Sequence, residues 1–110
     1  MKRNILWTAL FVLVGFGLAQ AQGTLTGIIS GNVKSPDGLA FPGVTVTVKS
    51  PGLQGVRSST TDQNGNYIFK ALPPGRYLIT FQVAGMQTLE KSADLELGRA
   101  ISIDGTLQVG

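Results

Sequence analysis

Two tight turns flank one short alternating strand in residues 61–77, and this segment constrains the fold more than any other part of the chain. Asp62 and Gly65 suit the first and last positions of a type I turn, and the Asn-Gly pair that ends it accepts the positive φ of a short hairpin. In the strand that follows, Tyr67 and Phe69 lie on one face because side chains alternate along a β-strand. Such a segment is typical of a β-sandwich.

A second turn is expected at Pro74-Gly75, where that strand ends. Proline presets φ at the second position of a type II turn, and glycine accepts the positive φ of the third position. The next expected strand, residues 76–84, is the most apolar strand of the chain. We therefore expect it near the centre of a sheet, with these side chains facing the core: Tyr77, Ile79, Phe81 and Val83.

Runs of β-branched and aromatic residues recur between clusters of Gly, Pro, Asn and Asp, and no segment has a convincing helical period. Besides the two strands around Pro74-Gly75, the expected strands are residues 27–34, 44–49, 56–61, 88–97 and 101–109. Short strands at fairly even spacing indicate a sandwich and not alternating strands and helices. The sequence predicts an all-β fold, an antiparallel β-sandwich of about seven strands.

Alternation also predicts the core. In the strand 44–49, three valines face one way, while two threonines and a lysine face the other, so one side is core and the other is solvent. Toward the end of the chain the inward residues are expected to be Ala93, Leu95, Leu97, Ile101, Ile103, Leu107 and Val109. A shift of one residue would turn these side chains outward, so the register should be firm.

Residues 1–21 have the layout of a secretory signal peptide. Two basic residues precede an apolar run from Ile5 to Leu18, and Ala19-Gln20-Ala21 supplies the small residues of a cleavage site. The alternative is an uncleaved membrane anchor, but the apolar run is shorter than the roughly 20 residues that span a bilayer. We therefore expect export, cleavage before Gln22, and a mature domain of residues 22–110 without a membrane span.

Charge and residue content exclude several classes of function. Without Lys2 and Arg3 the nine Lys and Arg residues become seven, against six Asp and Glu, and the charges alternate in sign, so nothing indicates nucleic-acid binding. The chain has no cysteine, so packing and strand pairing must hold it together without disulfides. Without histidine and cysteine it also lacks the usual general base, thiol nucleophile and commonest metal ligands. We expect no enzymatic activity, no metal and no cofactor.

The sequence around Asp62 resembles part of a calcium-binding loop. The required ligand spacing and the terminal bidentate glutamate are both missing. We therefore expect an ordinary turn, in which the Asp62 carboxylate accepts hydrogen bonds from nearby backbone amides.

Three motifs follow one another along the mature chain: Ile29-x-Gly31-x-Val33, then Pro42-Gly43-Val44-x-Val46, then Thr61-Asp62-x-x-Gly65-x-Tyr67-x-Phe69-x-x-Leu72-Pro73-Pro74-Gly75-x-Tyr77. Together they closely resemble the carboxypeptidase regulatory-like domain, over nearly the whole mature chain. The resemblance implies a small seven-stranded sandwich of the transthyretin-like (prealbumin-like) type, also grouped with carbohydrate-binding-like folds. It implies structural roles for the motif residues, with glycines meeting backbone demands and aromatic side chains filling the core: Gly31, Gly43, Gly65, Gly75, Tyr67, Phe69 and Tyr77.

In bacteria, members of this family often stand between the signal peptide and the plug and barrel of TonB-dependent outer-membrane receptors. The layout here is similar to that front end, which implies a place in the periplasm or at the outer membrane, with receptor or envelope proteins as partners. Because the last expected strand runs to Gly110, we expect that the natural polypeptide either continues or is a truncated reading frame. The family resemblance implies a non-enzymatic accessory or interaction domain.

Two kinds of binding stay open. A carbohydrate-binding domain at the cell surface would need an exposed aromatic platform, and alternation leaves only Phe41 as a candidate ligand contact. The alternative for Phe41 is to plug one end of the sandwich. The strand 56–61 has small polar side chains and is expected at an edge, where it either adds a partner's strand or stays an ordinary unpaired edge.

Overall fold

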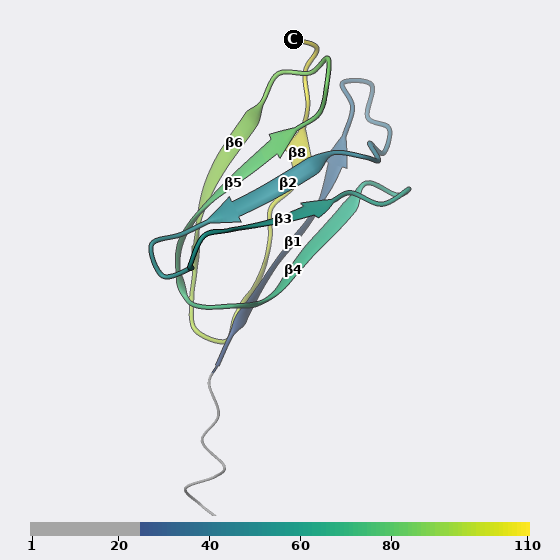
Figure 1. Cartoon of the computed structure of the whole chain (residues 1–110). Coiled ribbons are helices and arrows are strands. Elements are labelled where there is room, and N and C mark those ends of the chain that lie inside the picture. Colours follow the sequence, from purple (N-terminus) through teal and green to yellow (C-terminus); the bar gives the residue numbers. More distant parts are fainter. Residues whose placement is uncertain (1–24) are drawn as a thin grey trace, which may run out of the picture.

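The computed structural model describes residues 25–110, which form eight strands in two sheets (Figure 1). In chain order the strands are β1 (Gly27–Lys34), β2 (Thr45–Lys49), β3 (Val56–Thr60), β4 (Asn66–Leu72), β5 (Gly75–Gln82), β6 (Leu89–Leu95), β7 (Ala100–Ser102) and β8 (Gly105–Thr106). The expected all-β sandwich is confirmed, with one strand more than the seven predicted. The expected signal peptide lies outside the described residues. Within residues 25–110 no helix is long and apolar enough to cross a bilayer.

The two sheets pack face to face. One has the order β4-β1-β7, with β8 also paired to β1, and the other has the order β3-β2-β5-β6. Figure 1 shows the second sheet in front of β1, with β2 and β3 crossing the middle of the view. β5 lies between β2 and β6, so the most apolar strand is central as predicted, and β3 is an edge strand as predicted.

The core forms where alternation predicts it. The inward side chains of β2 and β5 have 0% exposure: Val46, Val48, Tyr77, Ile79 and Phe81. Tyr67 from β4 crosses the interior and packs edge-to-face on Phe69 and Phe81, with ring centroids 5.9 and 5.7 Å apart. Aromatic pairs of this geometry contribute about 0.5–1.5 kcal/mol beyond the burial of their surface. Tyr67 of β4 and Phe81 of β5 therefore join the two sheets.

The end of the chain differs from the predicted antiparallel strand. It forms two short strands, β7 and β8, and both run parallel to β1. Between them, Asp104 Oδ1 accepts the backbone N–H of Asn32 at 2.9 Å, in the place where a strand carbonyl would bind. The ladder is interrupted there because a side chain has replaced a backbone partner.

Two residues predicted to face inward are exposed instead. Leu97 is 58% exposed, because β6 ends at Leu95 and the chain has already turned. Val109 is 71% exposed, since it lies beyond β8 and pairs only through an isolated bridge with Met86. Alternation holds only within a strand, and in both cases the strand ends earlier than the pattern of apolar residues.

Two basic side chains close the open sides of the sandwich. On one side, Arg57 of β3 donates to the carbonyl of Lys70 in β4 at 2.7 Å, and its guanidinium lies 5.8 Å from the centre of the Phe69 ring. On the other side, Lys91 of β6 donates to the carbonyl of Asp104. Both residues occupy inward positions of edge strands, where a charged side chain covers the gap between sheets and discourages aggregation.

Candidate functional site

The turn before β4 is built as predicted. Asp62 Oδ1 accepts the backbone N–H groups of Asn64 and Asn66, both at 2.9 Å, and the N–H of Gly65 donates to the carbonyl of Asp62 at 2.9 Å. Gly65 has φ 78°, and a Cβ at this position would lie 2.5 Å from the carbonyl oxygen of Val33. Positive φ and close backbone approach both demand glycine here. The carboxylate of Asp62 is therefore engaged in holding the turn.

The second predicted turn has a different geometry. Gly75 does need positive φ, but its value of 149° is far from the roughly 80° of the third position in a type II turn. Pro74 lies in a bend, and β5 already begins at Gly75. The connection is instead fixed by Tyr77, whose hydroxyl donates to the carbonyl of Pro73 at 2.6 Å. Burial raises the pKa of the Tyr77 hydroxyl, so it stays a neutral donor.

Gly31 and Tyr67 form a structural contact with the end of the chain. The Tyr67 hydroxyl donates to the carbonyl of Ile103, and that carbonyl lies directly over Gly31. Any Cβ on Gly31 would collide with the Ile103 carbonyl oxygen and would lie 2.9 Å from Tyr67 Cε1. Burial, and secondarily the negative charge of Asp104, raise the pKa of Tyr67 well above its usual range. Tyr67 therefore acts as a buried hydrogen-bond donor and not as an acid or a base.

Replacing Tyr67 with phenylalanine should lower the free energy of unfolding by about 1–2 kcal/mol, because the Ile103 carbonyl loses its donor. The pH dependence should change as well. The pKa of Tyr67 is raised above the unfolded value of 10.0, so its stabilisation is complete below pH 10 and is lost as pH rises further. Urea unfolding between pH 8 and 11 should show a smaller alkaline loss in Tyr67→Phe than in the parent chain. If the free energy of unfolding fell equally steeply with pH in both chains, the role of the Tyr67 hydroxyl as a buried donor would be contradicted.

A polar cleft of about 470 Å³ lies on the outer face of the β4-β1-β7 sheet. Asn32 lines it and donates from Nδ2 to Asn66 Oδ1 and to the carbonyl of Asn64, both at 2.8 Å. The cleft is also lined by Asp62, Asp104, Ser30 and Ser102. Asn32 Oδ1 is buried without a partner among the described residues. The cleft can exchange hydrogen bonds with a polar ligand, but it offers no nucleophile paired with a base.

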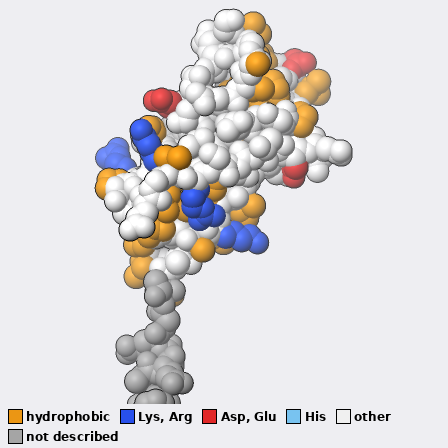
Figure 2. Space-filling model, in the orientation of Figure 1, with side chains coloured by type: hydrophobic (Ala, Val, Ile, Leu, Met, Phe, Trp, Pro, Cys, Tyr) orange, Lys and Arg blue, Asp and Glu red, His pale blue; other side chains and the backbone are white. Residues whose placement is uncertain are grey.

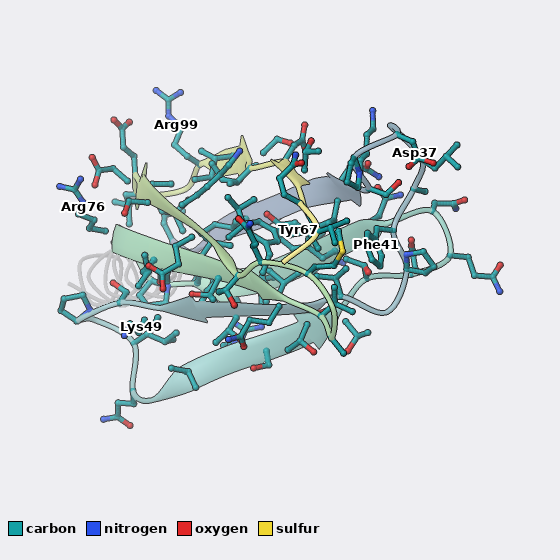
Figure 3. All side chains as sticks on the ribbon, turned by 90° about the horizontal axis from the view of Figure 1, so that it is seen from above. Asp37, Phe41, Lys49, Tyr67, Arg76 and Arg99 are labelled. Carbon is teal, nitrogen blue, oxygen red and sulfur yellow. The ribbon has the colours of Figure 1, made fainter. Side chains whose placement is uncertain are left out.

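The remaining predicted residues have structural positions. Phe69 is 2% exposed in the core. Gly43 has φ 78° in the turn before β2. Phe41 is partly buried and packs against the core, and its carbonyl accepts the hydroxyl of Thr61 at 2.7 Å. Phe41 therefore occupies the end of the sandwich, the alternative that the sequence left open, and it lies at the same end as Asp37 (Figure 3).

No group of three or more acidic, histidine or cysteine side chains that could hold a metal ion occurs in the described part of the chain. The cleft around Asn32 and the open edge at β3 are two candidate binding places on the described surface. Sequence reasoning identified the edge and missed the cleft. Its polar residues come from β1, the turn before β4, β4 itself, β7 and the segment after β7. The sequence shows that they share a face only once the strand pairing is known.

The model of the carboxypeptidase regulatory-like domain family matches residues 28–108 of this chain. The TonB-dependent transporter Oar of Myxococcus xanthus is 40% identical over 62 residues, which is 56% of this chain and 6% of that protein. The match therefore covers only a small part of that transporter's length.

Solved structures share the fold at low sequence identity. The TIE protein of Bacillus anthracis aligns with a TM-score of 0.67 and 16% identity, covering 77% of this chain and 17% of that one. A proposed carbohydrate-binding protein of Pseudomonas aeruginosa aligns with a TM-score of 0.58 and 19% identity, covering 77% of this chain and 90% of that one. At these identities the likeness establishes the sandwich and nothing about activity.

Proposed function

Because this chain belongs to the carboxypeptidase regulatory-like domain family, we propose that it is a non-enzymatic accessory or interaction domain of the bacterial cell envelope. It is exported, and it works in the periplasm or at the outer membrane. Its place is the N-terminal module of a TonB-dependent outer-membrane receptor, or a stand-alone relative of such a module. The 40% identity to part of a TonB-dependent transporter is the observation that carries this proposal.

The geometry supports a role in contact rather than catalysis. The phenol of Tyr67 is tied to a backbone carbonyl, and the Asp62 carboxylate is tied to backbone amides. These groups hold the fold and have no free partner with which to transfer a proton. What the surface offers is an unpaired strand edge and a polar cleft, both suited to binding.

Export is tested by expressing the full-length gene with a C-terminal tag in a Gram-negative host. The mature protein should be recovered from the envelope fraction, and its N-terminal sequence should begin at Gln22 because signal peptidase cuts after small residues. An Ala19→Arg, Ala21→Arg variant should retain Met1. Recovery of the unprocessed parent chain from the cytoplasm would refute the proposal.

The gene sequence distinguishes the N-terminal module of a receptor from a stand-alone module. Sequencing past the codon for Gly110 should reveal either a plug and many amphipathic strands, which would make the chain the front of a receptor, or a stop codon, which would make it a free module. Continuation into an unrelated enzyme would contradict both.

A carbohydrate-binding domain at the cell surface is the second candidate. The cleft around Asn32 favours it, because amides and carboxylates there can hydrogen-bond hydroxyl groups beside Ile68, an apolar side chain that is 48% exposed. The fold likeness to a proposed carbohydrate-binding protein points the same way. A glycan array should give signals that disappear in Ile68→Asp and persist in the control Leu39→Asp, which changes an exposed apolar side chain that does not line the cleft. Silence across a broad panel would remove this candidate.

A further inference from the structure

The edges of the two sheets are unequally protected. At the edge strand β4, the backbone N–H and carbonyl of Asn66 both have partners. The N–H donates to Asp62 Oδ1, and the carbonyl accepts the N–H of Asp62 at 3.0 Å. The carbonyl of Lys70 accepts a hydrogen bond from Arg57. β6 carries three charged side chains, and β7 and β8 are only three and two residues long. Each of these edges has a feature that discourages a further strand.

β3 carries one such feature, the inward Arg57, but among the described residues no hydrogen bond occupies the peptide groups on its open side. The N–H of Thr61 donates to the carbonyl of Val44 in the segment leading into β2, and the carbonyl of Thr61 accepts the N–H of Gly43. Because the peptide groups of successive residues point to opposite sides, even-numbered residues of β3 direct theirs away from β2. These residues are Val56, Ser58 and Thr60. β3 pairs with β2 alone, so this row of donors and acceptors faces the open edge.

The surroundings of this edge are basic. The two ion pairs among residues 25–110 join Arg76 to Asp94 and Arg99 to Glu96, so Lys49, Arg57 and Lys70 have no carboxylate partner there. Lys49 stands directly across from Val56, and Arg57 is part of β3 itself. Figure 2 shows Lys and Arg side chains on the lower and left parts of this face, and Asp and Glu at its upper and right margins.

An apolar groove continues from the same edge. A row of cross-strand neighbours runs Val56, Lys49, Leu78, Ser92 across all four strands of the sheet. They line a groove of about 560 Å³ together with Pro51 and Arg76, and Val56 at its open end is 59% exposed. Lys49 and Arg76 lie at the same end of the sandwich (Figure 3). A side chain added opposite Val56 would extend this row.

We propose that β3 binds an extended acidic segment of another polypeptide, which adds to the β3-β2-β5-β6 sheet as a further strand. Hydrogen bonds to the peptide groups of Val56, Ser58 and Thr60 supply the pairing. An apolar residue opposite Val56 enters the groove on the outer face, and the acidic residues on either side of it face inward, beside the guanidinium of Arg57. Two copies of this chain do not pair through β3, because each would bring the same positive charges. This inference rests on the proposed role as an interaction domain and specifies its partner.

The test is a fluorescence-anisotropy titration of the purified chain with a labelled peptide of about eight residues in which valine and glutamate alternate. The peptide should bind, and more weakly as salt rises. A matched peptide with lysine in place of glutamate should not bind. In nuclear magnetic resonance spectra, hydrogen exchange should slow at the amides of Val56, Ser58 and Thr60.

Variants assign the binding to this edge. Ser58→Pro removes an outward N–H without touching the ladder to β2, and it should weaken binding by about tenfold or more. Ile68→Pro makes the same change on the edge strand β4 and should leave binding unchanged. Lys49→Glu changes the charge beside the edge from positive to negative, so it should weaken binding of the acidic peptide through unscreened repulsion at low salt, and this test does not depend on whether the proline variant folds.

Three results would overturn the proposal: no binding by the parent chain, equal binding of the lysine peptide, or protection at β4 in place of β3. Dimerisation through β3 in sedimentation experiments would overturn it as well. None of these results would bear on export or processing, so failure here is distinguishable from failure of the proposed function.

Discussion

Replacing Gly31 with alanine is expected to lower the free energy of unfolding by about 3 kcal/mol or more, a large share of the roughly 5–10 kcal/mol of a domain this size. A Cβ here would overlap the Ile103 carbonyl oxygen and lie 2.7 Å from its carbon. Because these are backbone atoms, β7 and the segment after it would have to move away from β1. That shift would also break the hydrogen bond from the Tyr67 hydroxyl. Urea denaturation followed by circular dichroism measures the loss.

Gly52→Ala is the matched control for this experiment. Its added Cβ would meet only the carbonyl oxygen of Pro74, at an ordinary 3.7 Å. We expect a change within about 0.5 kcal/mol. If Gly31→Ala were as stable as Gly52→Ala, the parallel packing of the chain end on β1 would be wrong.

Phe81→Ala should be comparably damaging, with an expected loss of about 3–5 kcal/mol. Phe81 has 0% exposure in the central strand β5, packs edge-to-face on Tyr67, and covers Gly105 at the start of β8. Removing the ring leaves a cavity that both sheets line, and backbone pairing on either side of β5 prevents them from closing over it. Thermal and urea unfolding should both report the loss.

Phe41→Ala deletes the same ring from the end of the sandwich. Phe41 is only partly buried, so the expected loss is smaller, about 1–2 kcal/mol. A larger loss at Phe41 than at Phe81 would mean that the core is centred on the end of the sandwich and not between the sheets.

Much of this fold could be predicted from local pattern. The three valines of the segment 44–48 alternate with polar residues, and all three are fully buried. The turn at Asp62 follows from the properties of aspartate and glycine, which act over a few residues. The central position of β5 follows from its apolar composition, because a central strand is covered on both edges and buried on one face.

Other features depend on residues far apart in the chain. The family motif indicates a structural role for Gly31, but its neighbour, the carbonyl of Ile103, is 72 residues away in sequence. The inward positions of Arg57 and Lys91 break the alternation of their strands, and only the opposing sheet supplies the carbonyls that accept them. The cleft around Asn32 likewise needs β1, β4 and the chain end together.

The sequence alone determined the class of this protein: an all-β domain without histidine or cysteine, whose turns and alternating side chains specify strands and an inward face. Those properties are local, since backbone preference and side-chain alternation act between neighbouring residues. The tertiary structure decided which edges stay open and which close. That choice depends on where the side chains of Arg57 and Asp104 meet peptide groups of other strands. Such contacts exist only after the sheets have paired and packed.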